Sequence, residues 1–174
     1  NAKRAGEVIR RLRAMLRKEP PEFVSVAVND MIREVVRLLH SELIERGAIV
    51  AEEYSDGLPL VRGDHVQLQQ VVLNLITNAA DAMADLPPPR CISLATRSVD
   101  EGVLIQVSDH GPGVAPENRE RIFQAFVSLK ATGLGFGLAL SKSLVDAHGG
   151  KIWVTDNPPP QPGACFHLLL PRAG

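Results

Sequence analysis

The chain has few cysteines, few aromatic residues and almost no net charge, and each of these features excludes a class of protein. Its two cysteines, Cys91 and Cys165, lie far apart and outside any CxxC motif, which argues against a disulfide scaffold and favours a reducing, cytoplasmic setting. Aromatic residues make up 4% of the 174 residues, and the formal net charge is -1. Nucleic-acid binding through bulk charge or base-stacking platforms is therefore not expected.

The sequence also lacks a long hydrophobic run and a signal peptide. No apolar stretch approaches the roughly 20 residues that a membrane-spanning helix needs. The chain opens on Asn1, without a Met and already inside a helical pattern, so we expect it to be a piece of a longer protein. With 45% hydrophobic residues, it is long enough for one globular domain with a real core and a short appendage.

The appendage comprises residues 1–19, where apolar residues repeat at helical spacing. They form a narrow stripe among seven basic and two acidic residues, a pattern that suits the seam of a coiled coil or helical bundle. A helix lying on a membrane surface is the alternative, but Trp and Phe are missing from the apolar side. Pro20 and Pro21 end this helix, which leaves 20–174 as the globular domain.

Within the globular domain, patterns typical of strands and helices are interleaved. The first helix is expected to be capped by Asn29 or Asp30 and to end at Gly47. The second is expected to begin at an Asp64 cap and to end just before Pro87. Two further helices are expected over 116–123 and 137–148. Strands are expected at 23–28, 48–54, 91–99, 103–108, 151–155 and 164–170, with the last four in two hairpins. These elements predict an α+β fold, a mixed sheet covered by helices on one face.

The helix over 67–83 carries a polar row through an otherwise apolar pattern. Gln70, Asn74 and Asn78 follow one another at intervals of four residues, and Asp81 comes three residues later, so all four share one face. Asn is a poor helix former, and when buried it needs hydrogen-bond partners. Two of them one turn apart suggest a polar ligand. An ordinary amphipathic helix with a solvated row remains the alternative.

Two glycine-containing loops follow. In the first, Asp109 ends a strand and precedes Gly111 and Gly113. The carboxylate could accept from the exocyclic amine of adenine, and the glycines would let the backbone approach the base. The alternative is an ordinary tight turn, which is common for so short a pattern.

The second loop, from Lys130 to Gly137, leads directly into a helix. Its glycines expose backbone N–H groups at a helix N-terminus, which favours phosphate, and Lys130 adds a mobile cation. The loop lacks the Gly-Lys-Ser/Thr of a Walker A motif, and Leu138 stands where a dinucleotide fingerprint needs its third glycine. It is a phosphate loop of another kind, or a flexible linker.

In this order, the motifs resemble the N, G1, F and G2 boxes of the GHKL ATP-binding fold. They are Asn74 with Asn78, Asp109-x-Gly111-x-Gly113, Phe123-x-x-Phe126 and Gly133-x-Gly135-x-Gly137-Leu138. Residues 22–171 resemble the catalytic and ATP-binding domain of a bacterial sensor histidine kinase. Segments 121–130 and 140–150 are similar to kinases related to nitrogen and oxygen sensors. The resemblance implies a two-layer Bergerat-type sandwich, with residues 1–18 as the tail of the dimerisation and phosphotransfer domain's second helix.

The resemblance also implies roles for individual residues. Asp109 would bind the adenine amine in a pocket shaped by Gly111 and Gly113. Asn74 and Asn78 would face Mg²⁺ and the phosphates of ATP, and Asp81 would belong to the same site. The mobile lid over the triphosphate would contain Lys130, Thr132, Gly133, Leu134, Gly135, Phe136, Gly137 and Leu138, anchored by Phe123 and Phe126. The catalytic set would be Asn74, Asn78 and Lys130.

Two positions depart from the family pattern. His110 stands where Asn is usual. Cys165 stands where relatives have a Thr that helps to hold adenine, which puts that contact in question.

The function that the resemblance implies is phosphoryl transfer from Mg-ATP to a histidine outside this chain, for relay to an aspartate of a response-regulator receiver domain. The other partner would be the protein's own dimerisation and phosphoacceptor domain, in a homodimer of the full-length protein. ATP-hydrolysing relatives have a Glu general base at the position of Asn74, and a neutral amide cannot take a proton from water. The alternatives are a GHKL hydrolase that drives a clamp and a non-catalytic dimerisation module.

Overall fold

A computed structural model of the chain describes residues 20–124 and 137–174. The helices of this part are α2 (Val28–Leu38), α3 (His40–Glu45), α4 (His65–Ala82) and α5 (Gly137–Ala147), with short 3₁₀ turns at Pro116–Asn118 and Arg121–Phe123. The strands are β1 (Phe23–Val26), β2 (Ala48–Tyr54), β3 (Val61–Asp64), β4 (Arg90–Val99), β5 (Gly102–Ser108), β6 (Lys151–Asp156) and β7 (Ala164–Pro171).

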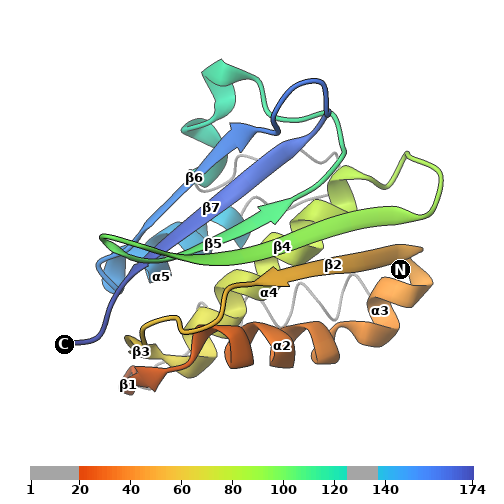
Figure 1. Ribbon diagram of the computed structural model, residues 1–174. Coiled ribbons are helices and arrows are strands. Elements are labelled where there is room, and N and C mark those ends of the chain that lie inside the picture. The colour runs from red at the N-terminus through yellow and green to blue at the C-terminus, as the bar shows by residue number, and fades with distance from the viewer. Residues whose placement is uncertain (1–19, 125–136) are drawn as a thin grey trace.

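The main sheet has five strands in the order β2-β4-β5-β7-β6. β2 and β4 are parallel, and the other neighbours are antiparallel, so the expected mixed sheet and both hairpins are confirmed. The helices lie on one side of this sheet (Figure 1). β1 and β3 form a separate antiparallel ribbon. β3 was not expected, because four residues that contain Gly63 and Asp64 show no clear strand pattern.

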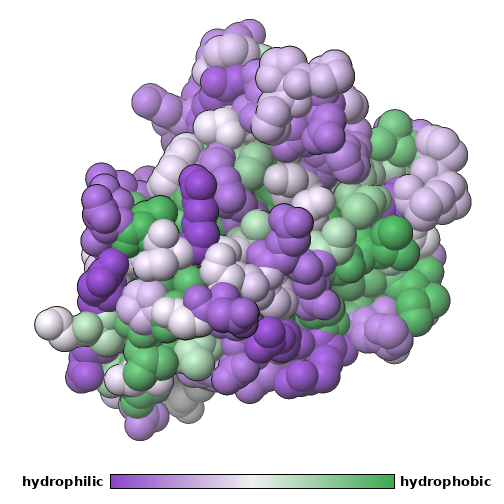
Figure 2. All heavy atoms as spheres, in the orientation of Figure 1, coloured by the Kyte–Doolittle hydropathy of each residue, from purple (hydrophilic) through white to green (hydrophobic). Residues whose placement is uncertain are grey.

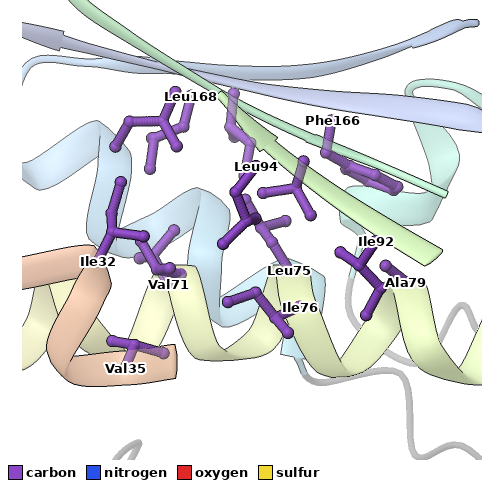
Figure 3. Packing of buried hydrophobic residues seen from close by; sticks show 14 of the residues in the cluster. Ile32, Val35, Val71, Leu75, Ile76, Ala79, Ile92, Leu94, Phe166 and Leu168 are labelled. Carbon is purple, nitrogen blue, oxygen red and sulfur yellow. The ribbon is translucent and has the colours of Figure 1, made fainter. Parts of the chain in front are cut away.

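α4 packs against the sheet at the centre of the hydrophobic core, with α2 and α5 as its neighbours in the helical layer (Figure 3). Its apolar side meets side chains from β4, β7 and α2; the buried set includes Ile32, Val35, Val71, Leu75, Ile76, Ala79, Ile92, Leu94, Phe166 and Leu168. Truncating a fully buried member such as Leu75 to Ala is expected to cost roughly 2–5 kcal/mol. The core therefore fixes the rotation of α4, which decides where its polar row points.

The structure differs from the sequence-based prediction of the first helix in two ways. It is divided at Leu39 into α2 and α3, and it begins at Val28 with Ala27 as the N-cap, without a side-chain cap. The proposed cap at Asn29 or Asp30 is therefore wrong. Asn29 instead donates to the carbonyl oxygen of Ser55 over 2.8 Å and accepts from the Thr96 hydroxyl over 2.8 Å. Its amide ties α2 to the sheet.

The N-terminus of α4 is capped as predicted. Asp64 accepts through Oδ1 from the backbone amide of Gln67 over 2.9 Å. Its second oxygen, Oδ2, accepts from the amide of Glu22 over 2.8 Å. The same residue thus starts the central helix and holds the segment that enters β1.

No helix in the described segments is both long and apolar enough to cross a membrane. Figure 2 shows the side of the molecule on which the sheet lies in front of α4 and α5, and hydrophilic and intermediate residues predominate there.

One short helix was expected over 116–123, but the structure has two separate 3₁₀ turns there. They belong to the connection between β5 and the segment that precedes α5.

Candidate functional site

Asp109 follows the end of β5 and is buried, with 2% of its surface exposed. Its Oδ1 accepts from the backbone amides of Gly111 over 2.8 Å and Ala164 over 3.3 Å. Burial raises the pKa of this carboxyl group, and the two amides oppose the rise. Because both bonds end on Oδ1, the carboxylate is held in one orientation with Oδ2 directed elsewhere.

The structure requires glycine at positions 111 and 113 of this loop for two different reasons. A side chain at Gly111 would place its Cβ 2.6 Å from the carbonyl oxygen of Ala82, so only glycine lets the loop lie against the end of α4. Gly113 has a φ of +79°, a conformation that other residues rarely adopt. The Asp-x-Gly-x-Gly pattern therefore seats a buried carboxylate beside the last turn of the central helix.

Asn74 is buried, with 3% of its surface exposed, in the middle of α4. Its Nδ2 donates to the hydroxyl of Ser141 over 3.2 Å and to the carbonyl oxygen of Gly137 over 3.3 Å. Its Oδ1 accepts from Gln70 over 3.1 Å. The polar row of α4 is thus partly engaged with the first turn of α5, and Ser141 is a member of this cluster that the sequence patterns did not single out.

Asn78 is half-buried one turn further along the same face of α4. The next residue at that spacing is Ala82, whose carbonyl group lies against Gly111. One helical turn is about 5.4 Å, so Asn78 lies between the Asn74 cluster and the loop of Asp109. The helix therefore brings two of the three predicted motifs to one side of the core.

Asp81 forms an ion pair with Arg46, which follows α3. Arg46 also lies 4.0 Å from a carboxylate oxygen of Glu42. The carboxylate of Asp81 therefore has a cationic partner 35 residues away in the sequence, which the helical pattern alone could not reveal.

The predicted lid is described only at its C-terminal end. Gly137 and Leu138 form the first turn of α5, and Leu138 packs against the core. Phe123 packs there as well and meets Phe166 edge-on, with ring centroids 6.2 Å apart. The remaining predicted lid and anchor residues lie outside the described part of the chain: Phe126, Lys130, Thr132, Gly133, Leu134, Gly135 and Phe136.

Cys165 lies beside the site, but on a different face of the sheet from the core. It pairs with Ser108 and Thr155 in the strand register. Side chains alternate along a strand, and its neighbours Ala164 and Phe166 both belong to the hydrophobic core. Residue 164, through its backbone amide, makes the contact with Asp109.

The donor set available for a metal is sparse. In the part of the chain that the structure describes, no three His, Cys, Asp or Glu side chains are grouped to hold an ion. Mg²⁺ commonly keeps several waters and takes one or two protein oxygens together with substrate phosphates. The amide oxygens of Asn74 and Asn78 fit that sparse mode, although the first already accepts from Gln70.

Comparison with known proteins identifies the family. Residues 63–174 match the model described as histidine kinase-, DNA gyrase B- and HSP90-like ATPase. The chain is 35% identical over 172 residues to the sensor protein FixL of Bradyrhizobium diazoefficiens, a match over 99% of this chain and 34% of the relative. It is 31% identical over 171 residues to the sensor histidine kinase TmoS of Ectopseudomonas mendocina, over 97% of this chain and 17% of the relative.

Solved structures agree with this result. The structure of full-length ShkA in complex with AMPPNP superposes with a TM-score of 0.76 at 32% identity, covering 95% of this chain and 34% of that one. The chain thus spans about a third or less of these relatives. The family match includes α4, the Asp109 loop and α5, which carry the site. The chain belongs to the histidine kinase-, DNA gyrase B- and HSP90-like ATPases, as a GHKL domain of the sensor histidine kinase type.

Proposed function

We propose that this chain is the ATP-binding catalytic domain of a two-component sensor histidine kinase. The observation that carries the proposal is the buried carboxylate of Asp109, with Oδ1 fixed by two backbone amides. Its Oδ2 would accept from the exocyclic amine of adenine, in a pocket shaped by Gly111 and Gly113. The complex of ShkA with AMPPNP, an ATP analogue, supports ATP as the ligand.

The phosphates of ATP would lie toward Asn78 and Asn74, and Asn78 is the better placed of the two to hold a Mg²⁺ ion. When bound, Mg²⁺ neutralises charge on the phosphates. Asp81 is assigned to the same site with Arg46 as its partner. The residues proposed to cover the triphosphate are Lys130, Thr132, Gly133, Leu134, Gly135, Phe136, Gly137 and Leu138.

The proposed reaction is transfer of the γ-phosphoryl group to a histidine outside this chain. Asn74 cannot serve as a general base, because an amide does not take a proton from water. Catalysis would consist of positioning and charge neutralisation by Asn78, Lys130 and the backbone amides of the lid. The acceptor would belong to the protein's own dimerisation domain, in a homodimer. The final recipient would be an aspartate of a cytoplasmic response regulator.

Incubation with ATP labelled at the γ-phosphate tests this proposal. We expect the chain alone to bind Mg-ATP without labelling itself. It should phosphorylate a separately supplied dimerisation domain of the same protein that carries its histidine. Asp109→Asn should abolish the transfer, and Asp100→Asn, an exposed residue in the β4–β5 turn, serves as the matched control.

Two results would contradict the proposal. Robust self-labelling of the chain would place the acceptor inside it. Steady release of phosphate without any transfer would favour a hydrolase.

A further inference from the structure

Asn157 is a buried polar residue in a loop, which is an unusual combination. It follows β6 and opens the loop 157–163, which contains four prolines. Only 6% of its surface is exposed. Its Nδ2 donates to two backbone carbonyl oxygens, that of Pro162 over 2.8 Å and that of Asp109 over 2.6 Å. The second acceptor belongs to the residue that we assign to adenine.

The loop closes tightly around the backbone of Asp109. The amide of Asp109 donates to the carbonyl of Ala164 over 3.0 Å, and the amide of Asn157 donates to the carbonyl of Gly163 over 3.2 Å. Gly163 has a φ of +101°, and a Cβ there would overlap the carbonyl oxygen of Asp109. The main chain of Asp109 is thus enclosed on one side by Asn157 and Gly163. Gly111 and Ala164 hold its carboxylate.

We infer that Asn157 is a positioning residue for recognition of the adenine base. It clamps the loop 157–163 onto the main chain of Asp109 and so determines where the free carboxylate oxygen points. This inference rests on the proposed function. Binding sites need the groups that contact the ligand held within about 0.5 Å of the productive geometry. The Asp109 carbonyl oxygen that accepts from Asn157 is two bonds from the Cα that carries the side chain. Losing the Asn157 amide would also leave the buried carbonyl oxygen of Asp109 without this donor.

The test compares two nucleotides that differ at the group that Asp109 would read. ATP carries an amine at C6 of the purine, whereas inosine triphosphate carries a carbonyl oxygen, which cannot donate to a carboxylate. Calorimetric titration with each nucleotide in Mg²⁺ gives both affinities and their ratio. We expect Asn157→Ala to weaken ATP binding by about 5- to 10-fold, which is less than the loss of a whole hydrogen bond to a charged group, because the variant misaligns this bond without removing it. Binding of inosine triphosphate should change by less than about 2-fold.

Asn157→Asp keeps the shape of the side chain and removes its donors, so it should lower the ratio at least as much. Gln161→Ala is the matched control, because Gln161 is exposed in the same loop. It should leave both affinities unchanged. If Asn157→Ala does not fold, Asn157→Ser retains one hydroxyl donor and should show an intermediate ratio.

The outcomes separate the inference from the proposed function. Wild-type protein that binds neither nucleotide would overturn both. Wild-type protein that prefers ATP, with variants at position 157 that keep the same preference, would overturn the inference alone. An equal loss of both affinities would do so too, because it would show a general structural role.

Discussion

The side-chain amide of Asn74, in the middle of α4, donates to the hydroxyl of Ser141 in α5 over 3.2 Å. The two residues are 67 positions apart in the sequence. Ser141 in turn donates to the carbonyl of Gly137 over 2.9 Å, so the first turn of α5 is bound to the central helix through one amide. The predicted lid ends in this first turn, at Gly137 and Leu138.

Asn74→Ala should therefore destabilise the fold as well as impair the site. It leaves the buried hydroxyl of Ser141 without its partner on α4, and the expected loss in the free energy of unfolding is about 1–3 kcal/mol. Urea denaturation measures it. Asn78→Ala, at a half-buried position of the same face, should cost less stability and more ATP affinity. Equal unfolding midpoints for Asn74→Ala and wild type would contradict this role.

Asp109→Asn should lose ATP affinity and gain stability at neutral pH. Burial raises the pKa of this carboxyl above its ordinary value of 3.8. At any pH between the ordinary pKa and the raised pKa, the folded state therefore binds more protons than the unfolded state. The free energy of unfolding consequently falls as the pH rises through that window, and it stays lowered above it. The Asn variant keeps the oxygen that accepts from Gly111 and Ala164 but removes the buried charge.

Melting temperatures measured from pH 3 to 8 check this prediction. This range extends about one unit below the ordinary pKa of Asp and several units above it. The advantage of Asp109→Asn over wild type should be largest at neutral pH and shrink toward the acid end. Asp100→Asn, which removes an exposed carboxylate, is measured beside it as the control. A variant less stable than wild type at pH 7 would mean that burial of the charge is fully compensated.

Gly111→Ala should weaken nucleotide binding by displacing the loop of Asp109 from α4. A Cβ would lie 2.6 Å from the carbonyl oxygen of Ala82, and backbone cannot move aside as a flexible side chain does. Gly57→Ala is the control: Gly57 has a φ of +68°, but a Cβ added there would meet no atom within 4 Å. We expect Gly57→Ala to lower stability by about 1 kcal/mol and to leave ATP affinity unchanged, as calorimetry would show. Similar affinities for both variants would contradict the close-approach argument.

His148→Phe should loosen the ribbon of β1 and β3. The ring nitrogen Nε2 accepts from the amide of Asp64 over 3.0 Å, and Nδ1 donates to the carbonyl of Leu144 over 2.7 Å. The ring also stacks on Phe23, with centroids 4.7 Å apart. The Phe variant retains an aromatic ring and loses both hydrogen bonds, at about 1 kcal/mol each.

Amide hydrogen exchange at Asp64 is the direct measurement, because that donor loses its acceptor. Exchange should accelerate by roughly 5-fold or more, the factor that corresponds to about 1 kcal/mol. The amide of Gln67, bonded to the Asp64 side chain, provides an internal reference. Unchanged exchange at Asp64 would mean that His148 contributes packing alone.

Much of the fold was predictable because its signals are local. The alternation of strands and helices, the two hairpins and the Asp64 cap each depend on residues within a few positions of one another, and the structure confirms them. The errors occurred where tertiary contacts overrode local preference. Asn29 suits an N-cap, but its amide binds Ser55 and Thr96 on the sheet instead, and β3 forms only because β1 pairs with it.

The sequence by itself determined the family and the residue types of the proposed site, because motif order and spacing are properties of the chain alone. Tertiary structure decided the partners: Arg46 for Asp81, Ser141 for Asn74 and Asn157 for the backbone of Asp109. These pairs are 35, 67 and 48 residues apart. Hydrogen bonds at such separations depend on how the core sets the rotation of α4 and the path of each loop, and no local pattern encodes that.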